Sequence, residues 1–446
     1  MAADSFTIQN VTIVNEGGCY QASVHIEDGR IAKIQPPLKE GGGDYLLPGI
    51  IDGHVHMREP GLTHKATMES ETRAAARGGV TTVLDMPNVV PQTTTLQLLK
   101  ERYALGEGKC HVNYGFYLGA TNDNLEEIKQ LNPTLCPGVK LFMGSSIGGM
   151  LVDREEKLRQ IFKESPTLIM THCEDMERIK ERTHQATLDS RRESQPPLGG
   201  EMFNDLPIHF HPIIRDHEAC YRSTELAVRL AKEEGARLHV AHITTAQELE
   251  LFDPADDRIT AEACVPHLLF TDADYETLGA RIKCNPAIKT AADRDALRRA
   301  LTDGRIRTIA TDHAPHQLSE KEGGCLKAMS GMPMVQFSLP AMLSFVDEGI
   351  LSLERLVELM CHNPARLYGI QDRGFIREGY WADLTLVRRH PWTVTNEDIE
   401  SLCGWSPLEG RNLGWQVEKT WVNGKLVWDG TSFLLPPQGK RVLFNP

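Results

Sequence analysis

Short apolar segments recur along the middle of the chain, separated by stretches with apolar residues at helical spacing. Apolar runs of this length between turn residues are typical of buried parallel strands. Eight strand-plus-helix units in succession predict a closed (β/α)8 TIM-like barrel rather than an open sheet. The eight predicted strands cover residues 49–56, 80–86, 111–118, 138–143, 167–172, 236–242, 258–264 and 306–311.

Both ends of the chain have a different pattern, with shorter strands and hairpin signals. Asp28-Gly29 precedes an alternating apolar stretch, and Asn423-Gly424 lies between two others. Such dipeptides favour tight β-turns. We expect the two ends to pair into one small composite β-sandwich. The predicted domains are 1–48 and 372–446 for the two parts of this sandwich, and 49–371 for the barrel.

The connections between the predicted strands differ in length. Residues 66–77 predict a helix that stops at Gly78-Gly79. The connections 173–235 and 316–340 are longer, and the first includes the polar stretch 187–206. Long connections often serve as lids or interface arms, which is the role we expect for both.

Chemically distinctive side chains follow the predicted strands, at the end where such barrels place their reactive groups. In an extended strand alternate residues share a face, so His54, His56 and Arg58 are expected to enter one pocket. The later strands contribute Asn88, Lys140, His172, His242, Asn285, Asp312 and His316.

Each of these residues also has an ordinary structural explanation. A lone histidine is often a hydrogen-bonded core residue, Lys140 can extend its amine to the surface, and Asp312 can cap a helix. Their joint recurrence at one rim instead favours a shared site. Four histidines, one carboxylate and one buried lysine are the ligands of a two-metal centre.

Lys140 has distinctive chemistry in such a place. A buried ammonium beside divalent cations is repelled and desolvated, so its neutral amine is favoured. A neutral amine can react with carbon dioxide to form a carbamate, whose two oxygens can bridge two metals.

Composition narrows the class of protein. A net charge of -13 and a pI near 5.7 argue against general nucleic-acid binding. No apolar run reaches the length of a membrane span, the N-terminus lacks the form of a signal peptide, and the ten cysteines are scattered. We therefore expect reduced thiols, a cytoplasmic location and no membrane partner.

The sequence resembles the amidohydrolase superfamily and, within it, the cyclic-amide hydrolases of the dihydroorotase family. The resemblance runs nearly end to end and is carried by Asp52-Gly53-His54-Val55-His56-Met57-Arg58-Glu59-Pro60-Gly61, Met86-Pro87-Asn88, Leu238-His239-Val240-Ala241-His242, Thr311-Asp312-His313-Ala314-Pro315-His316 and Asn363-Pro364-Ala365. It implies reversible hydrolysis of L-dihydroorotate to N-carbamoyl-L-aspartate in pyrimidine biosynthesis.

The resemblance also implies roles for single residues. His54, His56, Lys140 and Asp312 would hold one zinc, and carbamylated Lys140 with His172 and His242 the other. A metal-bridging hydroxide would attack the ring amide, with Asp312 as the catalytic base and then acid. Arg58, Asn88, Asn285 and His316 would bind the substrate, and Gly331 would offer its backbone to it.

Alternative functions remain open at this point. Dihydropyrimidinases, hydantoinases and allantoinases share the metal histidines, but they lack the combination of Arg58 with Met86-Pro87-Asn88. Many dihydroorotases of this length have aspartate in the place of the bridging lysine, and the loop around Gly331 departs from the family pattern. Inactive relatives serve as scaffolds, usually after losing ligands that this chain retains. The resemblance further implies a homodimer or larger homo-oligomer, with association with aspartate transcarbamoylase as another expectation.

Overall fold

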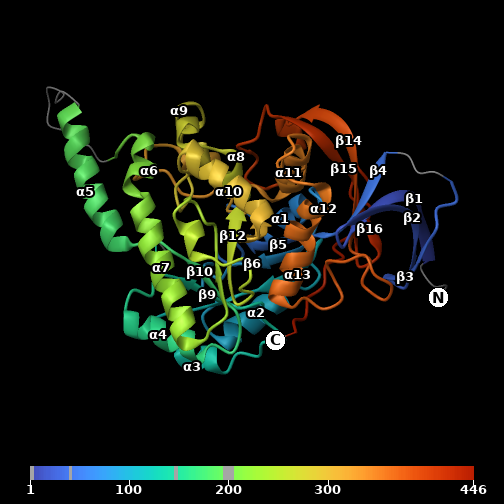
Figure 1. Cartoon of the computed structure of the whole chain (residues 1–446), viewed down its shortest axis with the longest axis horizontal. Coiled ribbons are helices and arrows are strands. Elements are labelled where there is room, and N and C mark those ends of the chain that lie inside the picture. Colours follow the sequence, from blue (N-terminus) through green and yellow to red (C-terminus); the bar gives the residue numbers. More distant parts are fainter. Residues whose placement is uncertain (1–4, 40–42, 145–148, 194–204, 446) are drawn as a thin grey trace.

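The architecture is taken from a computed structural model, which describes residues 5–39, 43–144, 149–193 and 205–445. A barrel surrounded by helices forms one part of the molecule, and strands from both chain ends form the other (Figure 1). The polar stretch predicted at 187–206 lies partly outside the described residues.

The barrel is built from parallel strands that follow one another in sequence. One group of three and one group of six are hydrogen bonded in the order of the chain. Their bounds are β5 Ile50–Val55, β6 Val80–Asp85, β7 Asn113–Phe116, β8 Leu118–Gly119, β9 Val139–Phe142, β10 Ile169–His172, β11 Leu238–Val240, β12 Ile259–Cys264 and β13 Ile306–Ala310.

Two junctions close this barrel. The third predicted strand, at 111–118, is in fact two short strands interrupted at Tyr117, so that β7 pairs with β6 and β8 pairs with β9. At the other junction, Val55 and His313 form a parallel bridge, and the His56 amide donates to the His313 carbonyl at 2.7 Å. The predicted (β/α)8 barrel is thereby confirmed.

Helices on the outside of the barrel connect its strands. The predicted helix at 66–77 is α1, Met68–Arg77, which begins where the Thr67 side chain accepts from the Ser70 amide at 3.0 Å and ends at Gly78. The longer helices that follow are α2 Leu96–Gly106, α4 Glu155–Glu164, α5 Met176–Glu193, α7 His217–Glu234, α10 Ala291–Asp303 and α11 Ser338–Asp347. The shorter ones are α3 Leu125–Lys129, α6 His211–Ile214, α8 Val265–Leu269, α9 Tyr275–Leu278, α12 Leu353–Val357 and α13 Asn363–Tyr368.

The two ends of the chain form one seven-stranded sheet, with the order β16-β15-β14-β4-β1-β2-β3. Its strands are β1 Ser5–Asn15, β2 Gly18–Glu27, β3 Arg30–Gln35, β4 Asp44–Pro48, β14 Leu384–Thr393, β15 Asn412–Val422 and β16 Lys425–Trp428. Val24 of β2 and Trp421 of β15 share one hydrophobic core, so strands from both chain ends enclose the same interior. Asp28-Gly29 and Asn423-Gly424 form the predicted turns, each with two positive φ angles.

The last residues leave this sheet and return to the barrel. The Val442 amide donates to the Tyr114 carbonyl at 3.0 Å, and the Phe444 amide to the Thr134 carbonyl at 3.1 Å. The C-terminal segment therefore lies along β7.

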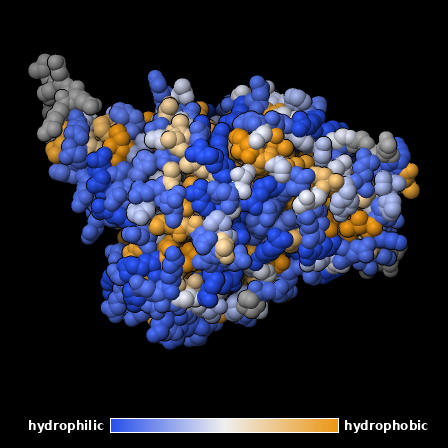
Figure 2. All heavy atoms as spheres, in the orientation of Figure 1, coloured by the Kyte–Doolittle hydropathy of each residue, from blue (hydrophilic) through white to orange (hydrophobic). Residues whose placement is uncertain are grey.

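The surface seen in Figure 2 is mainly hydrophilic, with scattered apolar patches. Among the described residues, none of the helices has the length and apolar character needed to cross a bilayer.

Candidate active site

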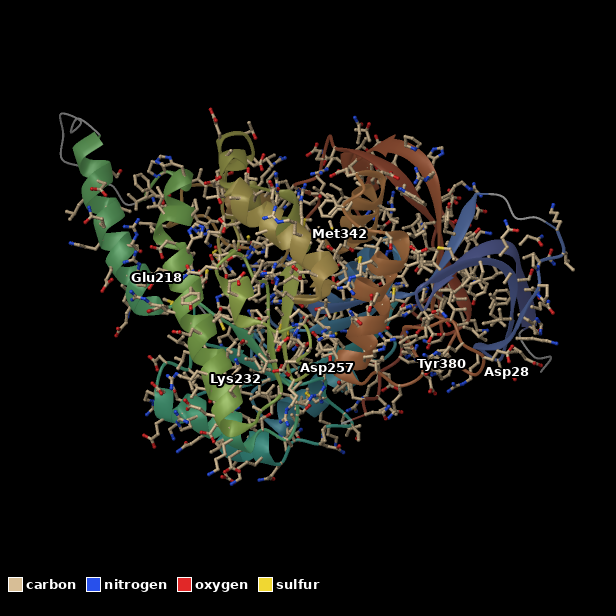
Figure 3. All side chains as sticks on the ribbon, viewed as in Figure 1. Asp28, Glu218, Lys232, Asp257, Met342 and Tyr380 are labelled. Atoms are coloured by element: carbon tan, nitrogen blue, oxygen red, sulfur yellow. The ribbon has the colours of Figure 1, made fainter. Side chains whose placement is uncertain are left out.

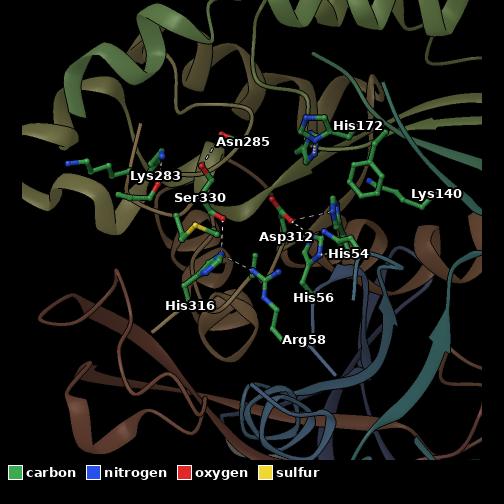
Figure 4. Close-up of a pocket in the computed structure, with 18 of the residues that line it drawn as sticks. His54, His56, Arg58, Lys140, His172, Lys283, Asn285, Asp312, His316 and Ser330 are labelled. Atoms are coloured by element: carbon green, nitrogen blue, oxygen red, sulfur yellow. Dashed lines mark hydrogen bonds and ion pairs between the residues drawn. The ribbon is translucent and has the colours of Figure 1, made fainter. Parts of the chain in front are cut away.

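The residues predicted to act together meet in one cavity of about 260 Å³. It opens at the carboxyl ends of the barrel strands, where Figure 4 shows side chains converging from several strands. All the predicted site residues line this cavity: His54, His56, Arg58, Asn88, Lys140, His172, His242, Asn285, Asp312, His316 and Gly331.

His54, His56 and Asp312 form its most compact group. The Asp312 Oδ1 atom lies 3.0 Å from His56 Nε2 and 3.3 Å from His54 Nε2. Burial opposes ionisation of Asp312, but the charge of His54 and the hydrogen bond from His56 outweigh it and hold the pKa of the carboxyl below its usual range. Their ligand atoms all lie within 4.8 Å of one another, an arrangement suited to a metal ion.

His172 and His242 form a second group beside the first. His172 Nδ1 lies 3.0 Å from His242 Nε2, and the His242 ring centroid lies 5.4 Å from that of His54. Burial lowers the pKa of both imidazoles, with His172 adding to the effect on His242. Neutral imidazole is the form that binds metals.

Lys140 also lines the cavity, with a side chain that is almost completely buried. Its Nζ atom has no hydrogen-bond partner among the described residues. An unpaired buried ammonium is costly, and burial lowers the pKa of this lysine to about 8. A divalent metal centre fits these residues, since histidine and carboxylate atoms cluster next to an amine that otherwise lacks a partner.

The backbone is strained where the strands enter this site. Arg58, His242 and Asp312 have φ angles of 66°, 37° and 48°. Such angles cost about 1–3 kcal/mol in residues other than glycine and tend to persist at functional sites. At these three positions the positive φ angles redirect the backbone just after a strand ends, where the side chains line the cavity.

The predicted carboxylate-binding residues lie on one side of the metal-ligand group. Arg58 Nε donates to the Pro315 carbonyl at 3.0 Å, and Arg58 Nη2 lies 3.0 Å from His316 Nε2. Asn88 is turned toward the metal ligands, with its Oδ1 atom 2.8 Å from His56 Nδ1. Burial and the charge of Arg58 lower the pKa of His316.

Asn285 and Gly331 line the part of the cavity next to Ser330, whose carbonyl oxygen lies 3.0 Å from His316 Nε2. Asn285 Oδ1 accepts from Ser330 Oγ at 3.1 Å. The Gly331 amide already donates to the Lys283 carbonyl at 2.8 Å, and its carbonyl accepts from Lys321 Nζ at 2.6 Å. Contact of the Gly331 backbone with a substrate would therefore require an exchange of hydrogen-bond partners.

The two long connections meet at the mouth of the cavity. Leu326 and Lys327 line its wall, and their amides donate to Asp205 Oδ1 at 2.9 and 3.3 Å. The Gly324 amide donates to Asp205 Oδ2, and Cys325 donates to the Leu206 carbonyl. Residues 205–206 therefore hold the loop that forms this wall.

Two buried glutamates that the sequence did not single out support the predicted metal ligands. Glu262 Oε1 lies 2.8 Å from His54 Nδ1, and Glu174 Oε2 lies 2.9 Å from His172 Nε2. Arg215 forms an ion pair with Glu174. Carboxylates of this kind orient metal-binding histidines. Both could have been noticed in the sequence, because Glu262 is a carboxylate inside the apolar strand β12 and Glu174 follows His172 by two residues.

Comparisons with known proteins agree with this geometry. Residues 45–427 match the model of the Amidohydrolase family. A dihydroorotase from Halobacterium salinarum is 33% identical over 88% of this chain and 88% of its own length, and an allantoinase from Streptomyces avermitilis is 30% identical over 100% of both. The solved structure of an L-hydantoinase (dihydropyrimidinase) from Arthrobacter aurescens superimposes with a TM-score of 0.89 at 28% identity, covering 98% of this chain and 99% of that one. With this match over most of its length and its barrel fold, the chain belongs to the Amidohydrolase family.

Proposed function

We propose that this chain is a dihydroorotase, which hydrolyses L-dihydroorotate reversibly to N-carbamoyl-L-aspartate. The observation that carries the proposal is Arg58, a buried guanidinium in the same cavity as the metal-ligand residues. Burial lowers its pKa only to about 10, so it is charged at neutral pH. Its hydrogen bonds to Pro315 and His316 leave further N–H donors for a substrate carboxylate.

The proposed cofactor is zinc, two ions per subunit. His54, His56 and Asp312 would hold one ion and His172 and His242 the other, with carbamylated Lys140 shared between them. The amine of Lys140 would add to carbon dioxide and release one proton, forming one N–C bond. Bound metal supplies Lewis acidity toward the ring carbonyl and lowers the pKa of water.

The remaining steps belong to the side chains of the protein. Arg58 and His316 bind the substrate carboxylate and fix the ring, so that its amide faces Asp312. Asp312, as a carboxylate, takes a proton from the attacking water. Asp312 then passes that proton to the departing ring nitrogen as the C–N bond breaks, and N-carbamoyl-L-aspartate leaves.

Allantoinases and hydantoinases are the competing assignment, because relatives of those names have similar identity to this chain. Allantoin and hydantoin lack a carboxylate on the ring. A site with a buried arginine is expected to disfavour them, because the guanidinium would be desolvated without an anionic partner.

A substrate panel tests the assignment. The zinc-loaded protein is assayed with dihydroorotate, dihydrouracil, hydantoin and allantoin, alongside the variants Arg58→Met and Arg229→Met. Arg229 is a matched control, an exposed arginine of α7 that pairs with Glu155 of α4 and Glu233 of α7. We expect dihydroorotate to have the highest kcat/KM, and Arg58→Met to lower that value by at least about 100-fold, as expected for loss of about 3 kcal/mol of charge-assisted hydrogen bonding. Preference of the wild type for a neutral ring, or an equal loss with every substrate, would overturn the proposal.

A further inference from the structure

A second cavity, of about 490 Å³, lies at the other end of the barrel from the active site. Arg237, one of its lining residues, directly precedes β11, whose opposite end leads to His242. Other lining residues come from α13 and from the segment that joins the barrel to the seven-stranded sheet. Tyr380 belongs to that segment and is labelled in Figure 3 at this junction.

Four arginines line this cavity, and none of its described lining residues is acidic. Two of the arginines are already neutralised. Arg373 pairs with Asp383 and donates to Asn423 Oδ1 at 2.8 Å. Arg377 forms an ion pair with Glu16 and donates to the Tyr380 hydroxyl at 3.1 Å.

Arg237 and Arg366 differ, because neither has a carboxylate partner among the described residues. Arg237 Nη2 donates to the Leu367 carbonyl at 2.8 Å, and Arg366 Nη1 donates to Asn363 Oδ1 at 3.3 Å. A guanidinium carries five N–H donors, so most donors of both groups remain available. Burial, with a smaller contribution from the charge of Arg258, lowers the pKa of Arg237.

This concentration of positive charge contrasts with the rest of the chain, whose net charge is -13. Like charges gathered without counter-ions destabilise the fold, and a bound anion removes that cost. Two guanidiniums lining one cavity match the several oxygens of a phosphate group, to which each can donate two parallel hydrogen bonds.

Phe375 and Tyr380 are the aromatic residues that line the cavity, and the Arg377 guanidinium lies over both rings. One face of Phe375 is stacked by His362, with ring centroids 4.4 Å apart and an interplanar angle of 6°. The guanidiniums of Arg377 and Arg366 lie 4.3 and 5.1 Å from the same ring. Since the ring is already occupied in this way, recognition rests on charge rather than on stacking of a base.

We propose that this cavity binds a phosphate-bearing small molecule, with Arg237 and Arg366 donating to its phosphate oxygens. Arg373 and Arg377 complete a positive wall while retaining their own carboxylate partners. This site is separate from the metal-ligand cavity and does not depend on which cyclic amide the protein hydrolyses.

Isothermal titration of the full-length, zinc-loaded protein tests the proposal, with inorganic phosphate and glycerol 3-phosphate as probes at constant ionic strength set by potassium chloride. We expect saturable binding of at least one probe with a Kd below about 10 mM. Tighter binding of glycerol 3-phosphate identifies a phosphate ester as the preferred class, and tighter binding of inorganic phosphate identifies the free anion.

Four variants locate the binding. Arg237→Gln and the exposed Arg366→Gln should each weaken it at least tenfold, whereas Arg229→Gln on α7 should change it less than twofold. Arg58→Met, which alters the other anion-binding cavity, should also leave this binding within twofold. Absence of saturable binding by the wild type, or equal binding by Arg366→Gln, would overturn the proposal. So would loss of binding in Arg58→Met alone, since the phosphate would then occupy the active-site cavity.

Discussion

Replacing Asp205 with alanine would release the loop that forms one wall of the active-site cavity. The Asp205 carboxylate accepts hydrogen bonds from the amides of Gly324, Leu326 and Lys327. These bonds, with burial opposing them, hold the pKa of the carboxyl below its usual range, so the group is ionised at neutral pH. For three bonds at a half-buried site, we expect a combined loss of about 2 kcal/mol, which lowers the ratio of closed to open loop by a factor of about 30.

Limited proteolysis with trypsin measures this opening directly, because Lys327 lies within the released segment. When a loop opens and closes faster than the protease cleaves, the cleavage rate follows the open population. Asp205→Ala should therefore be cut after Lys327 about 30-fold faster than the wild type. If the loop is a wall of the substrate site, KM for dihydroorotate should also rise. The rise should roughly equal the factor by which the fraction of molecules with a closed loop falls.

Two further variants serve as controls. Asp205→Asn keeps one side-chain oxygen and should give an intermediate cleavage rate. Asp429→Ala removes a similar acceptor from an exposed turn, where Asp429 accepts from Thr431 and Ser432, and should leave cleavage after Lys327 unchanged. The reasoning fails if Asp205→Ala is folded but is cut no faster than the wild type, or if Asp429→Ala accelerates that cleavage equally.

Three other outcomes follow from the site. Glu262→Gln removes the carboxylate beside His54 and should weaken zinc affinity about 10- to 100-fold, measured by competition with a chromogenic chelator; an unchanged affinity would exclude Glu262 from orienting this ligand. Gly331→Ala would place a Cβ atom 2.6 Å from the Ala314 carbonyl oxygen at a φ of 130°. It should lower the free energy of unfolding, measured in urea, by about 2–4 kcal/mol. Gly349→Ala, at a φ of 72° with open space around it, should lower that free energy less. Dialysis against dipicolinate should abolish hydrolysis, and added zinc should restore it; full activity in metal-free protein, verified by atomic absorption, would contradict the metal centre.

The barrel could be predicted because its strands are short apolar runs with chemically distinctive residues directly after them. That local pattern located both metal-ligand groups and Arg58, since parallel strands place their carboxyl ends at one rim. The division of the third strand at Tyr117 could not be predicted, because apolar or aromatic residues continue across the break, at Val112, Tyr114, Phe116, Tyr117 and Leu118.

The site residues that could not be predicted act through contacts between segments far apart in the sequence. Asp205 and Gly324 are 119 residues apart, and an aspartate in a polar connection carries no mark of the amides it will bind. Glu262 is visible in the sequence as a carboxylate within an apolar strand, but its partner is fixed only when the barrel brings His54 beside it. Such pairings depend on tertiary structure and have no local periodicity.

The seven-stranded sheet contains strands from both ends of the chain, so it cannot form completely until the C-terminal strands have been synthesised. β4 lies between β1 and β14, so one of its edges has no partner until β14 leaves the ribosome. At about 5–20 residues per second, the roughly 340 residues between β4 and β14 take on the order of 20–70 s to translate. An unpaired strand edge is a site for incorrect pairing with other chains. β4, one of the first strands to be made, is thus among the last to complete its pairing, and the nascent chain must keep its free edge from incorrect pairing while the whole barrel is being translated.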